Sequence, residues 1–89
     1  MAPEPGDTVW IPCEVRSSAF ADERRVNIES PAGRWAGIVD VRQLRDEIVD
    51  GTTAIRATIV GMAHGKLAAR LPGQTRYREY LSVTETLLT

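Results

Sequence analysis

Cys13 and His64 are the residues of this chain best suited to nucleophilic or general-base chemistry, and each is the only one of its type. A catalytic nucleophile needs a base within hydrogen-bond reach, and that base is most often histidine. Cys13 lies in an alternating apolar stretch, which is typical of a small core residue. His64 precedes Gly65 in a predicted tight turn, where a solvated side chain is expected. The two residues therefore give no indication of a catalytic pair.

Other motifs of catalysis and ligand binding are also missing from the sequence. The carboxylate pairs Asp22-Glu23 and Asp46-Glu47 fit solvated loop charge better than the buried pairs used in acid–base catalysis. The stretch from Gly61 to Gly65 lacks the Lys-Ser/Thr of a phosphate-binding loop. One cysteine and one histidine do not supply the four ligands of a structural zinc site. We expect a non-enzymatic protein with no catalytic residues, no metal and no cofactor.

The chain has 89 residues, of which 43% are hydrophobic, and its net charge is -1. This length supports one small core, so we expect a flexible lead-in over residues 1–6 and a single domain over residues 7–89. No apolar run approaches the roughly 20 residues that span a bilayer. The first residues lack the basic and apolar regions of a secretory signal. We therefore expect a cytoplasmic protein with no membrane partner.

The segment from Asp7 to Arg16 has the period-2 pattern of a half-buried strand. Its apolar face carries Val9, Ile11, Cys13 and Val15, and Trp10 falls on the opposite face. Pro12 cannot donate a main-chain hydrogen bond, so it predicts an edge or a bulge in this strand. Trp10 is therefore expected outside the core.

The rest of the chain predicts further short strands separated by Gly and Pro turns. Strands are expected over residues 25–30, 34–41, 53–63, 66–71 and 76–83. Gly37 predicts a bulge or a close backbone approach, and residues 42–49 predict a short helix or a 3₁₀ turn with Gly51 as its cap. The last ten residues fit either a strand or a short helix. We predict an all-β fold, a small barrel of five to six antiparallel strands with a short helical turn near residues 42–49.

The stretch Trp35-Ala36-Gly37-Ile38-Val39-Asp40-Val41-Arg42-Gln43-Leu44 resembles the late strand of Src-homology-3-like small barrels of the bacterial type. In that class a Gly-apolar-Val strand passes into a short 3₁₀ turn closed by an apolar residue, here Leu44. The first strand, long loop and second strand resemble residues 7–30, so the resemblance covers about residues 7–60. It implies a small binding barrel. Peptide-binding members carry tyrosines on the first strand and long loop, but Tyr77 and Tyr80 lie near the C-terminus, so binding of proline-rich peptides is not implied.

Protein interaction or self-association is the function that the sequence favours. Exposed aromatic side chains with polar neighbours are typical of interface anchors, and a core this small gains stability from association. The candidate contact residues are Trp10, Phe20, Asp22, Glu23 and Trp35.

Nucleic-acid binding is the alternative. Residues 70–78 form the most basic window of the chain, and small barrels bind single strands by combining cationic side chains with stacked aromatics. The candidate residues are Arg70, Arg76, Tyr77 and Arg78, with Trp35 as a second stacking platform. Because the net charge is -1, no attraction to nucleic acid is expected from the chain as a whole.

Overall fold

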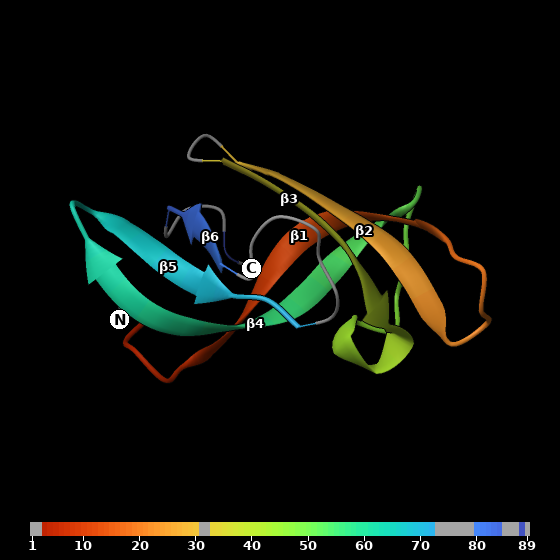
Figure 1. Cartoon of the computed structure of the whole chain (residues 1–89), viewed down its shortest axis with the longest axis horizontal. Helices are drawn as coiled ribbons and strands as arrows, with labels where there is room; N and C mark the ends of the chain where they lie inside the picture. The colour runs from red at the N-terminus through yellow and green to blue at the C-terminus, as the bar shows by residue number, and fades with distance from the viewer. Residues whose placement is uncertain (1–2, 31–32, 73–79, 85–87, 89) are drawn as a thin grey trace.

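The computed structural model describes residues 3–30, 33–72, 80–84 and 88. These residues form β1 (Thr8–Ser17), β2 (Glu23–Ser30), β3 (Gly33–Asp40), a 3₁₀ turn η1 (Val41–Gln43), β4 (Thr52–Ala63), β5 (Lys66–Arg70) and β6 (Tyr80–Val83). All six strands belong to one antiparallel sheet in the order β3-β2-β1-β4-β5-β6 (Figure 1). β3 and β6, at the two ends of this order, contact each other. The sheet therefore curls into a nearly closed barrel, which confirms the predicted all-β fold.

Alternation along the strands sorts side chains between the inside and the outside of this barrel. In β1, Ile11 and Cys13 are buried while Glu14 is exposed. The core is made of aliphatic side chains from all six strands, with Trp35 and Leu44; its fully buried large members are Ile11, Ile28, Ile55, Ile59, Leu81, Val26, Val39 and Val83. The predicted apolar face of the first strand is thus the core face.

Two Gly-containing turns join strand segments with backbone that ordinary residues rarely adopt. His64 and Gly65 have φ angles of 54° and 74°, and Asp50 and Gly51 have 52° and 74°. Positive φ at both central residues matches the tight hairpin turn whose twist suits antiparallel strands. The predicted His64-Gly65 turn is confirmed. Gly51 is not a helix cap: it closes a turn in which Val49 and Thr52 exchange hydrogen bonds of 3.0 and 2.9 Å.

The helical segment expected over residues 42–49 is shorter than predicted. η1 covers only Val41–Gln43, and Leu44 already has extended backbone. Leu44 bridges to Ile55 of β4 and is 6% exposed. Burial of this side chain against the sheet replaces a second helical turn, because a helix of two turns has little stability of its own.

Irregularities in the sheet occur at other positions than Gly37. The β2–β3 register passes Gly37 without a shift, whereas β4 and β5 shift register between Ile59 and Gly61. A second irregularity involves Pro12. β1 pairs with β4 from Thr8 to Glu14, but with β2 only from Glu14 to Ser17. β1 and β2 therefore separate beside Pro12, which agrees with the edge that its missing N–H predicts.

Candidate functional site

Trp10 lies on the outer face of β1, half-buried between two guanidinium groups. Its cross-strand partner in β4 is Arg56, and the Arg56 guanidinium carbon is 5.4 Å from the centre of the Trp10 rings. The corresponding distance for Arg45 is 4.9 Å. Both distances are in the range of cation–π attraction, for which tryptophan is the best partner. Trp10 thus limits the positions that both guanidinium groups adopt.

A network of hydrogen bonds places Arg45 beside Trp10. The Asp40 carboxylate caps η1 by accepting the Arg42 main-chain N–H at 2.8 Å. The Arg45 N–H donates to the Ala54 carbonyl at 3.0 Å, and the Thr53 hydroxyl donates to the Arg45 and Glu47 carbonyls at 3.3 and 2.8 Å. The segment after η1 is therefore fastened to β4, and Arg45 with it.

The carboxylate that caps η1 stays charged well into the acidic range. Hydrogen bonds from the Arg42 side chain and main chain hold the pKa of Asp40 below its ordinary value, and the same contact raises the pKa of Arg42. The cap is therefore present at neutral pH.

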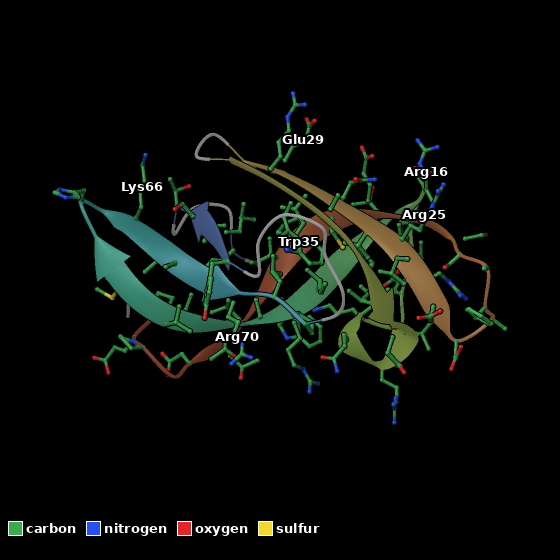
Figure 2. All side chains as sticks on the ribbon, in the orientation of Figure 1. Arg16, Arg25, Glu29, Trp35, Lys66 and Arg70 are labelled. Atoms are coloured by element: carbon green, nitrogen blue, oxygen red, sulfur yellow. The ribbon has the colours of Figure 1, made fainter. Side chains whose placement is uncertain are left out.

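Further outward-facing residues extend this surface across β4, β5 and β6. Thr58 lies opposite Arg70 of β5, and Arg70 lies opposite Tyr80 of β6. A pocket of about 330 Å³ opens here and is lined by Gln43, Arg56, Ala57, Thr58, Arg70, Leu71 and Pro72. Figure 2 shows Arg70 at the outside of the β4–β5 layer, away from Trp35 in the middle of the molecule. We call the surface formed by Trp10, Arg45, Arg56, Thr58, Arg70 and Tyr80 the Trp10 face.

The Trp10 face is positively charged. The pairs Trp10–Arg56, Thr8–Thr58, Thr58–Arg70 and Arg70–Tyr80 include no carboxylate. Among the described residues, the ion pairs are Arg34 with Glu29 at 3.5 Å and Arg42 with Asp40 at 3.1 Å. Arg45, Arg56 and Arg70 take part in neither, so their guanidinium groups are open to an external anion.

The residues predicted for protein contact do not converge on one surface. Phe20 is 65% exposed and lies beyond the end of β1 that is opposite to Trp10, next to exposed Asp22 and partly buried Glu23. The Arg24 side chain donates to the Ala21 and Glu23 carbonyls at 2.8 and 2.7 Å, which fastens this loop to the start of β2. Trp10 and the Phe20 loop are therefore separate features.

Trp35 is a core residue in this structure. It is 3% exposed and belongs to the buried cluster, because the phase of β3 points Trp35 and Val39 inward. It offers no open ring to a protein or to a nucleic-acid base, so the expected surface role does not fit its position. Of the residues predicted for nucleic-acid contact, Arg70 is exposed on the Trp10 face, while Arg76, Tyr77 and Arg78 lie outside the described residues.

Cys13 and His64 are far apart along β4. Cys13 pairs with Thr53 near the start of that strand, and His64 follows its last residue in an exposed turn. Burial raises the pKa of the Cys13 thiol to about 11, which keeps it neutral and unreactive at physiological pH. In the part of the chain that the structure describes, no group of three or more His, Cys, Asp or Glu residues is placed to hold a metal ion.

Sequence reasoning missed three members of the Trp10 face: Arg45, Arg56 and Tyr80. Arg56 alternates with the apolar residues of its strand, which marks it as outward-facing, but its pairing with Trp10 depends on strand order. The chain matches no protein-family model, no curated protein and no solved structure. None of the helical segments described is long and apolar enough to cross a bilayer.

Proposed function

We propose that this chain is a non-enzymatic binding module that takes single-stranded nucleic acid on the Trp10 face. The observation that carries the proposal is the alternation of arginine and aromatic side chains on a surface whose cross-strand pairs include no carboxylate. Proteins that bind single strands combine a cationic groove for the phosphates with side chains on which bases stack. We assign the barrel to the Src-homology-3-like class, with which its nearly closed antiparallel sheet is compatible.

Each part of the Trp10 face has a distinct task in this proposal. Arg56 and Arg70 flank the 330 Å³ pocket and hold a phosphate there, since guanidinium matches phosphate in bidentate geometry. Tyr80 is 49% exposed and offers a ring to a base. Trp10 restricts Arg45 and Arg56, which lowers the entropy lost when they bind.

The other function that the sequence favoured, protein contact through Trp10, Phe20 and Trp35, has less support. Those side chains occupy an outer face, a distant loop and the core. A protein partner with an acidic segment would still fit the arginines of the Trp10 face, so the experiment includes one.

Titration with single-stranded oligonucleotides tests the proposal. Ten-nucleotide oligo-dT and oligo-U are added at low and moderate salt while Trp fluorescence and amide chemical shifts are followed. We expect salt-sensitive binding with shifts on β4 and β5. Arg56→Gln and Arg70→Gln should each weaken it about three- to tenfold and lower the salt slope by about 0.7. Arg34→Gln, which removes an exposed arginine outside the Trp10 face, is the matched control.

Two outcomes would overturn the proposal. One is the absence of any response at low salt. The other is equal or tighter binding of a ten-residue polyglutamate peptide with the same dependence on Arg56 and Arg70, which would assign the face to an acidic protein partner.

A further inference from the structure

A cleft of about 620 Å³ lies where β1 and β2 separate. Its walls are residues 12–14 of β1 and 27–29 of β2, and Arg34, Trp35, Ala36 and Thr52 complete the lining. Each wall is about 10 Å long at the usual rise of a strand. The cleft therefore has the length of three to four residues of extended chain.

Main-chain groups of both walls face this cleft. The Val15 N–H donates to the Gly51 carbonyl at 2.8 Å, toward β4. Because successive residues of an antiparallel strand address opposite neighbours, Pro12 addresses the β2 side. Glu14 pairs with Asn27, so the same alternation directs the N–H and C=O of Glu29 toward β1. Within the described residues, β1 and β2 do not pair at these positions.

Side chains give the cleft an apolar floor and a charged rim. Cys13, Ile28 and Trp35 are buried beneath it. On the rim, Glu29 pairs with Arg34 at 3.5 Å, whereas Glu14 makes no ion pair with any described residue. Arg16 and Arg25 lie directly opposite each other one pairing step beyond the closed end, and Figure 2 shows them on the same side of the molecule.

We propose that the β1–β2 cleft binds an extended segment of a partner protein, which adds as a strand between Pro12 and Glu29. Main-chain hydrogen bonds supply affinity in this mode, and alternate side chains supply specificity. One side chain faces the floor at Trp35 and is apolar and small. Its neighbour faces outward beside Glu14 and is lysine or arginine. The positive pair Arg16–Arg25 confines this cation to the open side of Glu14.

This site is independent of the proposed nucleic-acid surface. It uses main-chain groups and Glu14, and none of the three arginines of the Trp10 face lines it. Arg56→Gln and Arg70→Gln are therefore expected to leave peptide binding unchanged, so either proposal can fail alone.

A seven-residue peptide that alternates lysine and valine, blocked at both ends, is the probe. Amide chemical shifts and amide hydrogen exchange of the full chain are measured with and without it. We expect binding, with exchange at the Glu29 amide slowed about fivefold or more. Glu29→Pro removes that N–H at a position facing away from β3 and should weaken binding about tenfold. Glu29→Gln keeps the N–H and serves as its control.

The charge of the rim is tested separately. Glu14→Gln should weaken binding of the lysine peptide about two- to fivefold, and Glu47→Gln, another exposed carboxylate, should have no effect. The inference is overturned if the peptide does not bind, if a glutamate–valine peptide binds equally well, or if Glu29→Pro binds as tightly as Glu29→Gln while remaining folded.

Discussion

The Trp10 face and the β1–β2 cleft lie on the same strand two residues apart, and they use different parts of the chain. On the Trp10 face the main chain is fully paired with β4 through Arg56 and Thr58, and side chains are presented outward. In the cleft the pairing stops at Glu14, and the main chain itself is presented. One strand therefore offers two kinds of recognition because its partner on one side departs before its partner on the other.

The two tryptophans show the same division at the level of one residue type. Trp10 and Trp35 both sit in regular strands, but the phase of each strand decides their fates. Trp10 is partly buried under guanidinium groups, whereas Trp35 is 3% exposed and forms the floor of the cleft. A tryptophan in a small barrel is thus either part of the core or a support for polar groups outside it.

The largest expected effect separates these two tryptophans by stability. Trp35→Ala should lower the free energy of unfolding by about 3–5 kcal/mol, because it empties a large site in the core. Trp10→Ala should cost only about 1–2 kcal/mol, since it removes partial burial and exposed cation–π contacts. Urea unfolding measures both, with Trp35→Phe as a milder variant should Trp35→Ala not fold. Equal costs for the two alanine variants would erase the distinction between core and outer tryptophan.

A second prediction concerns the core side of the cleft and uses Cys13. Burial raises the pKa of this thiol from 9.0 to about 11 in the folded chain. A raised acid pKa stabilises the fold fully below pH 9, and this contribution is lost as the pH rises toward 11. Between pH 8 and 10.5 the loss is about 2 kcal/mol at most.

The measurement is the free energy of unfolding at both pH values for the chain and for Cys13→Ala. Other groups titrate in this range, so the difference between the two slopes is the quantity that matters. Identical slopes would mean that solvent reaches the thiol through the cleft.

The strands were largely predictable from the sequence because alternation is a local signal. The period-2 pattern around Ile11 identified the core face of β1, and His64-Gly65 marked a turn whose geometry only a few residue types tolerate. The segment after β3 was harder, because Leu44 resembles a helical position until its burial against Ile55 is known.

The binding surfaces were much less predictable because they depend on which strands become neighbours. Arg56 and Trp10 are 46 positions apart in the chain and become partners only through the β1–β4 register. The outward phase of Trp10 was predicted correctly. The inward phase of Trp35 was not, since the alternation of β3 is interrupted by Gly37 and leaves either face available. Pro12 signalled an edge, but the cleft follows from where β2 departs.

The smallest expected effect tests whether Arg45 and Trp10 act together on the outer face. A double-mutant cycle of Arg45→Ala and Trp10→Phe, with stability as the readout, should give a coupling of about 0.5–1 kcal/mol. Thr53→Val removes the hydroxyl that fastens the Arg45 segment and should reduce that coupling, because the guanidinium then samples positions away from the ring. The same cycle with Arg34→Ala, whose side chain pairs with Glu29 on another strand, should give no coupling. A coupling near zero for Arg45 as well would mean that this guanidinium is held by the main chain alone, and that Trp10 orders only Arg56.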